Sequence, residues 1–146
     1  LLIEGCKFYD NCYMDFEGLM ENAALKIHRM KNSVIAHNYV SGAAYGHGIW
    51  ADANNENLLV EGNVVLHTRQ TQGSIFMEAS KEIILLQHNV VVDSKMNGHP
   101  NGGCGLYSHS SENITTRRNI SLLAFARSRI ISIPEWPPLR PLTSIR

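Results

Sequence analysis

Hydrophobic and polar residues alternate in short runs along the first 122 residues of the chain, and one run recurs. It consists of a small residue, an apolar residue, an aromatic residue, a small or apolar residue and a polar residue. Three copies occupy positions 48–52 (GIWAD), 74–78 (SIFME) and 105–109 (GLYSH), and a looser copy occupies 24–28 (ALKIH). Such alternation indicates β-strands, and no stretch of helical periodicity is long enough to compete. We therefore predict a strand at each copy.

Each copy is followed, 10 or 11 residues later, by an asparagine. These asparagines are Asn38, Asn63, Asn89 and Asn119, separated by 25, 26 and 30 residues. Repeats of this length are typical of solenoids, in which each unit is one supersecondary turn and covers the apolar face of the next. Strands repeated in the same orientation must pair in parallel. We therefore predict stacked β coils, with the asparagines as an inward ladder whose side-chain amides hydrogen-bond from coil to coil.

This pattern resembles the right-handed parallel β-helix, the fold of pectate lyases, polygalacturonases and several glycosidases. Residues 2–8 (LIEGCKF) match the second half of a coil, with Cys6 at the ladder position. The predicted fold class is therefore all-β, a right-handed parallel β-helix over residues 1–126. Residues 127–146 contain four of the five prolines, and proline lacks the amide donor that a central strand needs. We expect this segment to be a tail or a cap.

Composition narrows the classes of partner. The chain has 44% hydrophobic and 18% charged residues, with 13 basic against 13 acidic side chains. This balance argues against a nucleic-acid partner, which needs a basic excess, and no apolar run approaches a membrane span. No signal peptide is visible, but the chain begins in mid-coil without Met. We therefore expect an upstream part and slightly favour an extracellular or periplasmic location.

The sequence gives no reason to expect a metal or a cofactor. Its three cysteines, Cys6, Cys12 and Cys104, have no metal-type spacing. His37 and His88 share the position before a ladder asparagine, but no third ligand is evident. We therefore interpret these histidines as solvated side chains.

Alternation also assigns the two faces of each repeated strand. If Ile49, Ile75 and Leu106 point inward, the residues that follow them point outward. Two outward columns result, one of Lys26, Trp50, Phe76 and Tyr107 and the other of His28, Asp52, Glu78 and His109.

The first column has two interpretations. Stacked rings on neighbouring strands stabilise a sheet, whereas an exposed ring face could bind the C–H face of a sugar. Trp50 is the best candidate for sugar binding because it adjoins the first acid, with Lys26, Phe76 and Tyr107 beside it. In the second column, His28 and His109 could hydrogen-bond substrate hydroxyls. All six are candidate carbohydrate-binding residues.

The second column contains two acids, Asp52 and Glu78. Outward carboxylates are usually just solvated, but two acids stacked in register repel each other, and folding does not need that arrangement. Adjacent strands lie about 4.8 Å apart, so we expect the carboxyl groups to be about 5–6 Å apart. This is close to the roughly 5–5.5 Å between the nucleophile and the acid/base of a retaining glycosidase.

The run at 48–52, followed one coil later by 75–78, looks like the active-site coils of β-helix glycoside hydrolases, particularly the family 120 β-xylosidases. In that family an Asp on one coil is the nucleophile and a Glu on the next is the general acid/base. The resemblance implies that Asp52 attacks the anomeric carbon and that Glu78 protonates the leaving oxygen. Glu21 is a candidate third acid, and the turn-rich stretch 97–103 is a candidate wall of the site.

Two other functions stay open. A polysaccharide lyase would use β-elimination, which usually calls for a calcium-binding acidic cluster and a basic proton acceptor. The outward face offers Lys26 but few acids, so hydrolysis is favoured. A non-catalytic carbohydrate-binding or adhesive solenoid would use the aromatic column as its platform.

Overall fold

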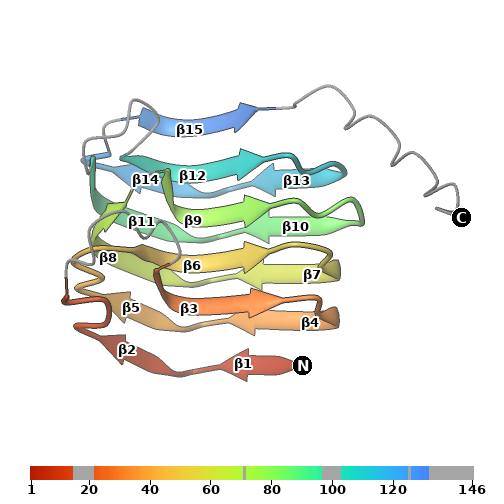
Figure 1. Cartoon of the computed structure of the whole chain (residues 1–146), viewed down its shortest axis with the longest axis horizontal. Coiled ribbons are helices and arrows are strands. Elements are labelled where there is room, and N and C mark those ends of the chain that lie inside the picture. The colour runs from red at the N-terminus through yellow and green to blue at the C-terminus, as the bar shows by residue number, and fades with distance from the viewer. Residues whose placement is uncertain (15–21, 71, 97–102, 125, 132–146) are drawn as a thin grey trace, which may run out of the picture.

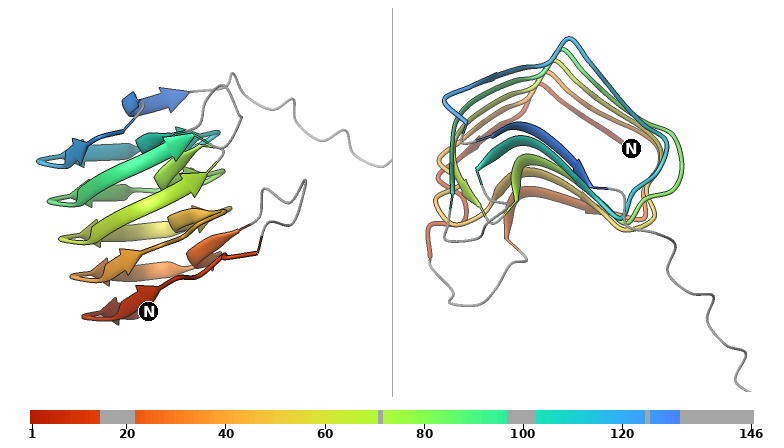
Figure 2. Two further views of the ribbon diagram at one scale, coloured as in Figure 1. Left: turned by 90° about the vertical axis from the view of Figure 1, so that its left-hand side faces the viewer. Right: turned by 90° about the horizontal axis from the view of Figure 1, so that it is seen from above.

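The computed structural model describes residues 1–14, 22–70, 72–96, 103–124 and 126–131. These residues form fifteen strands in three five-stranded parallel sheets. Each coil contributes one strand to each sheet, and the coils are stacked from the N-terminal end upward (Figure 1). Viewed along the stack, the coils superpose on one outline with the sheets along its sides (Figure 2). The predicted parallel β-solenoid is therefore confirmed.

The three sheets are named A, B and C in the order in which a coil enters them. Sheet A contains β1 (Leu2–Glu4), β4 (Lys31–Ala36), β7 (Glu56–Glu61), β10 (Ile84–Gln87) and β13 (Ile114–Arg117). Sheet B contains β2 (Lys7–Tyr9), β5 (Tyr39–Ser41), β8 (Val64–Gln70), β11 (Val90–Met96) and β14 (Ile120–Leu122). Sheet C contains β3 (Ala23–His28), β6 (His47–Asp52), β9 (Gly73–Glu78), β12 (Cys104–His109) and β15 (Ala126–Ile131). None of the described residues belongs to a helix capable of crossing a membrane.

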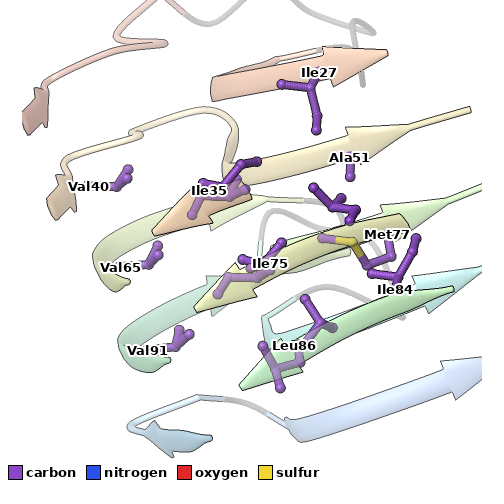
Figure 3. Close-up of a cluster of buried hydrophobic side chains, with 14 residues drawn as sticks. Ile27, Ile35, Val40, Ala51, Val65, Ile75, Met77, Ile84, Leu86 and Val91 are labelled. Carbon is purple, nitrogen blue, oxygen red and sulfur yellow. The ribbon is translucent and has the colours of Figure 1, made fainter. Parts of the chain in front are cut away.

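Aliphatic side chains from all three sheets fill the interior of the solenoid (Figure 3). Val40, Val65 and Val91 form a column on sheet B, and Ile49 and Ile75 form one on sheet C; all five are completely buried. Burial of a side chain of this size stabilises the fold by about 1.5–3 kcal/mol. The predicted inward facing of the sheet C residues is confirmed.

The asparagine ladder forms as predicted, at the corner between sheets A and B. The backbone N–H of Asn63 donates to Oδ1 of Asn89 at 3.0 Å, and Nδ2 of Asn63 donates to the same oxygen at 3.0 Å and to the Ile35 carbonyl at 2.9 Å. The same pattern links Asn38 to Asn63 and Asn89 to Asn119. The amide of Cys6 donates to Oδ1 of Asn38, so Cys6 occupies the ladder position of the first coil.

The residue before each ladder position has left-handed backbone dihedrals, and the chain changes direction there. These residues are Gly5, His37, Gly62, His88 and Arg118, with φ between 54° and 64°. At Gly62, a Cβ would lie 2.6 Å from Nδ1 of His37. Glycine adopts this conformation without strain, and at Gly62 it also leaves room for the His37 ring.

Sheet C continues further than expected. β15 pairs in parallel with β12, with Cys104 opposite Ala126 and His109 opposite Ile131. β15 itself spans Ala126–Ile131, so it runs past the boundary predicted at residue 126 from the prolines of the following segment. Residues 132–146, which carry the prediction of a tail or cap, lie outside the described part.

The first rung of the ladder suggests a stabilising substitution. Cys6→Asn should raise the free energy of unfolding by about 0.5–1.5 kcal/mol, because the new side-chain amide could donate to Oδ1 of Asn38 as the other ladder residues do. Cys6 is exposed, so the change leaves no cavity. Urea denaturation of the two proteins measures the difference. A Cys6→Ser variant should show no increase in the free energy of unfolding. An equal increase in the Asn and Ser variants would show that loss of the thiol, and not a new ladder hydrogen bond, is the cause.

Candidate functional site

The two predicted outward columns form on sheet C, and together they are called the sheet C site. In the first, Lys26 lies opposite Trp50, Trp50 opposite Phe76, and Phe76 opposite Tyr107. In the second, His28 lies opposite Asp52, and Glu78 opposite His109. Ala51 pairs with Met77, which places Asp52 and Glu78 next to each other at the ends of β6 and β9. The structure therefore brings together all eight predicted residues.

The aromatic column points away from the interior but is covered. Trp50, Phe76 and Tyr107 are only 3%, 1% and 4% exposed, and with Cys104 they form an apolar cluster separate from the interior core. The Trp50 and Phe76 rings stack with centroids 5.2 Å apart, and those of Phe76 and Tyr107 are 5.3 Å apart. The expectation of exposed ring faces is therefore wrong in this structure. Burial supports the alternative interpretation, in which stacking stabilises the sheet.

A histidine that the sequence analysis did not single out completes this cluster. His47 is 1% exposed, and its Nδ1 donates to the carbonyl oxygen of Gly73 at 2.7 Å. Its ring centroid lies 4.9 Å from that of Trp50 and 5.0 Å from that of Phe76. The available signal was its position directly before the GIWAD run, at the start of β6.

Within the described part of the chain, the indole N–H of Trp50 is buried without a hydrogen-bond partner. An unsatisfied buried donor costs about 1–3 kcal/mol, and in native proteins such a group needs an explanation. It lies in the same strand as Asp52, two residues away. An acceptor on a bound molecule is one way to satisfy it.

Lys26 connects the two columns. Its Nζ lies 3.1 Å from Oδ2 of Asp52 and 3.5 Å from the centroid of the Trp50 ring. The side chains of Lys26 and Asp52 are 28% and 20% exposed, so this charge pair is partly shielded from water. The ammonium group stabilises negative charge on Asp52 and is itself attracted to the indole face.

Glu78 has a histidine as its neighbour on the next coil. Its Oε1 lies 3.7 Å from Nδ1 of His109, and the two side chains are 28% and 35% exposed. The His109 ring is nearly parallel to that of Tyr107, at 6.5 Å between centroids. The two acids therefore have different partners, an ammonium group for Asp52 and an imidazole for Glu78.

A second ladder holds the backbone at the ends of the site strands. The amides of Met30, Asn55 and Ser80 donate to side-chain oxygens of Asn55, Ser80 and Ser111, each at 3.1 Å. In the same turns, Asn55 Nδ2 donates to the carbonyl of Asp52 at 2.6 Å, and Ser80 Oγ donates to that of Glu78 at 3.1 Å. The ladder therefore fixes the backbone from which both acids project.

The remaining predictions about the site cannot be placed in the same way. Glu21 and residues 97–102, predicted as a third acid and as a wall, lie outside the described part of the chain. Across the described residues, no group of three or more His, Cys, Asp and Glu side chains could hold a metal ion.

The two histidines that precede ladder asparagines lie away from the sheet C site. His88 Nδ1 is 3.2 Å from Oε1 of Glu61, and Gln87 Nε2 donates to the same oxygen at 2.7 Å. The hydrogen bond from His88, and then that from Gln87, hold the pKa of the Glu61 carboxyl below its ordinary value of 4.5. His37 adds a weaker coulombic contribution in the same direction.

This network predicts a small acid dependence of stability. Because the pKa of Glu61 is lower in the folded state, its contribution is complete above pH 4.5 and is lost as the pH falls through the folded-state pKa. Glu61→Gln should therefore lose less stability between pH 7 and pH 3 than the wild type. Urea midpoints at the two pH values measure this, and identical losses would exclude a role for Glu61.

Comparison with known proteins identifies the fold family. The model of a family described as "Right handed beta helix region" matches residues 1–121. No curated protein and no solved structure matches the chain. The match covers every coil through the ladder residue Asn119, in agreement with the observed parallel sheets. The chain therefore belongs to the right-handed β-helix family.

Proposed function

We propose that the protein is a carbohydrate-active β-helix protein, and specifically a retaining glycoside hydrolase of the xylosidase type. Asp52 would be the nucleophile and Glu78 the general acid/base. The observation that carries the proposal is the position of the two acids, side by side at the ends of β6 and β9 and partly exposed. Membership of the β-helix family is consistent with carbohydrate-active or adhesive proteins and supports the broader part of the proposal.

Strand spacing favours retention over inversion. Groups in register on adjacent strands start about 4.8 Å apart. A retaining enzyme needs carboxyl groups roughly 5–5.5 Å apart, whereas an inverting enzyme needs about 6.5–9.5 Å to place a water molecule. Because Asp52 and Glu78 stand at the ends of adjacent strands, the shorter separation fits them better.

The environments of the two acids suit different roles. The ammonium group of Lys26 lies 3.1 Å from Oδ2 of Asp52, which would act as the nucleophile in its carboxylate form. In the first step, Asp52 would form a bond to the anomeric carbon while Glu78 gives its proton to the departing oxygen. In the second, Glu78 would take a proton from water, which attacks the anomeric carbon and releases Asp52.

Substrate hydroxyls would be bound by neighbours in the same columns. His28 and His109 border Asp52 and Glu78 from the outer coils, and Lys26 can donate to a hydroxyl near Asp52. Trp50 is buried like the other two rings of its column, and its indole face holds the Lys26 ammonium group beside Asp52. Because the rings are buried, we assign Phe76 and Tyr107 a supporting role beneath the site in place of an open platform.

The competing functions have less support. A lyase would need a free base, but the ammonium group of Lys26 already contacts Asp52 and the Trp50 ring. No metal-type cluster of acids occurs among the described residues. A purely binding solenoid would not need two acids in register.

The test is hydrolysis of a panel of aryl glycosides, comprising xyloside, arabinofuranoside, galactoside and fucoside. We expect turnover of one substrate, with the first product retaining the anomeric configuration by ¹H NMR. An inverted first product would contradict the role of Asp52 as nucleophile. Without turnover on any substrate, cleavage of polygalacturonate to an unsaturated product would favour a lyase, and binding without cleavage would favour an adhesive solenoid.

A further inference from the structure

A polar hollow lies on the outer side of sheet B, away from the sheet C site. It has a volume of about 380 Å³ and is called the sheet B hollow. Its lining residues are Asp10, Gly42, Ala44, His67, Arg69, Asp93 and Lys95. They come from four successive coils, and none of them belongs to the sheet C site.

The hollow exists because one coil has small residues at both outward positions. Asp10, Gly42, His67 and Asp93 occupy the same corner of successive coils, each with left-handed backbone dihedrals. The second coil has Gly42 at this corner and Ala44 two residues later, where the third coil has His67 and Arg69. A Cβ at Gly42 would collide with Oδ1 of Asp10, so the Asp10 carboxylate leans across the glycine.

One side of the hollow is an ionic cluster centred on Asp93. Oδ2 of Asp93 lies 2.9 Å from Nδ1 of His67 and 3.1 Å from Nζ of Lys95. The hydrogen bond from His67, followed by that from Lys95, holds the pKa of Asp93 below its ordinary value. Asp93 is therefore a carboxylate that orients both bases, and its charge is already compensated.

Two charged groups in the hollow remain uncompensated. Neither the guanidinium of Arg69 nor the carboxylate of Asp10 has a side-chain hydrogen bond or ion pair within the described part of the chain. The two groups border the same space but do not form a salt bridge with each other. Gly42 and Ala44 leave room between them.

This arrangement specifies a ligand chemistry. A guanidinium group forms two parallel hydrogen bonds with a carboxylate, and an aspartate accepts hydrogen bonds from hydroxyl groups. The volume is at the lower end of the range for small-molecule sites. We propose that the sheet B hollow binds a small hydroxycarboxylic acid, such as a sugar acid, with its carboxylate on Arg69 and a hydroxyl on Asp10. The inference does not depend on the proposed hydrolase activity.

The experiment is a titration of the ¹⁵N-labelled protein with glucuronate, followed by amide chemical shifts. We expect shifts at Gly42, Ala44 and Arg69, weaker binding at high salt, and no binding of glucose at the same concentrations. Acetate should bind more weakly than glucuronate, because it lacks the hydroxyl groups that Asp10 would accept.

Variants separate the two contacts. Arg69→Gln should weaken glucuronate binding at least about tenfold. Asp10→Ala, which removes the hydroxyl acceptor together with a negative charge, should weaken glucuronate binding without weakening acetate binding. Ala44→Leu should fill the hollow and abolish binding. Lys81→Gln, which removes an exposed cation outside the hollow, is the control and should bind like the wild type.

Clear outcomes would overturn the proposal. These are shifts that map to another part of the molecule, equal binding of glucose, or unchanged binding by Arg69→Gln. Arg69 is exposed, so its variant should fold normally even if Ala44→Leu does not. Because the readout is binding, failure here leaves the glycosidase proposal intact, and loss of glycosidase activity leaves this one intact.

Discussion

Hydrolysis of the best aryl glycoside should fall at least about a thousandfold in Asp52→Asn and roughly 10²- to 10⁴-fold in Glu78→Gln. The first change removes the nucleophile and leaves an amide in its place, and the second removes the proton donor. Both preserve side-chain size, so the packing of β6 and β9 should be retained. Initial rates measured with equal concentrations of folded protein, checked by urea denaturation, test both expectations.

Azide distinguishes the two roles. As a small external nucleophile, it should restore turnover in Asp52→Ala, whose shortened side chain leaves room for azide, and give a glycosyl azide of configuration opposite to the substrate. In Glu78→Gln, Asp52 still forms the covalent intermediate, so the azide product should have the substrate's configuration. Glu56→Gln, which alters an acid paired with Lys31 on sheet A, is the matched control and should keep full activity. Wild-type rates in either site variant would exclude that residue from the chemistry.

The coils and the columns of the sheet C site could be predicted from the sequence because both depend on a strict register. A ladder asparagine recurs at 25, 26 and 30 residues, and its hydrogen bonds are repeated between coils. Alternation then decides which side chains share a face. These two facts alone place Asp52 beside Glu78.

Burial of the aromatic column could not be predicted in the same way. Alternation gives the direction in which a side chain points but does not show what covers it. Trp50 and Ile49 point to opposite faces of β6, yet they are 3% and 0% exposed. The cover includes contacts such as those of His47, which depend on the path of the chain between sheets B and C.

The second ladder was missed for a different reason. Its members Asn55, Ser80 and Ser111 differ in residue type and are separated by 25 and 31 residues. What they share is a side-chain oxygen. Each oxygen accepts a hydrogen bond from the backbone N–H of the corresponding turn in the preceding coil. A search for repeated hydrogen-bonding capacity, in place of repeated residue identity, would find this pattern.

The sheet B hollow has the weakest sequence signal because it results from missing side chains. Glycine and alanine are frequent residues, so Gly42 and Ala44 do not stand out in the sequence. They leave a hollow only because larger residues occupy the same positions in the neighbouring coils, Asp10 in the coil before and His67 and Arg69 in the coil after. In a solenoid, the ladder first gives the alignment of the coils. A coil whose outward residues are small then indicates a hollow between its two neighbours.

Replacement of Asn63 should have the largest effect on stability. Asn63→Ala should lower the free energy of unfolding by about 3–5 kcal/mol. It removes the acceptor of the Asn38 amide and side chain, both at 3.0 Å, and the donor to Ile35 and Asn89. The groups left without a partner are buried, and each costs about 1–3 kcal/mol. The total is smaller than the sum of the separate costs, because the groups are neighbours. Urea denaturation measures the loss.

Two comparisons show whether burial in the ladder is the cause. Asn32→Gly removes an exposed amide pair, in which Asn57 donates to Asn32 at 2.8 Å, and keeps the left-handed backbone at residue 32. It should change stability by less than about 0.5 kcal/mol. Asn119→Ala should fall between the two, because Asn119 is only partly buried and donates to Leu86 but to no further ladder residue in the described part. Equal losses in all three variants would show that the ladder adds nothing beyond ordinary surface hydrogen bonds, and the stability of the stacked coils would then rest on their aliphatic interior alone.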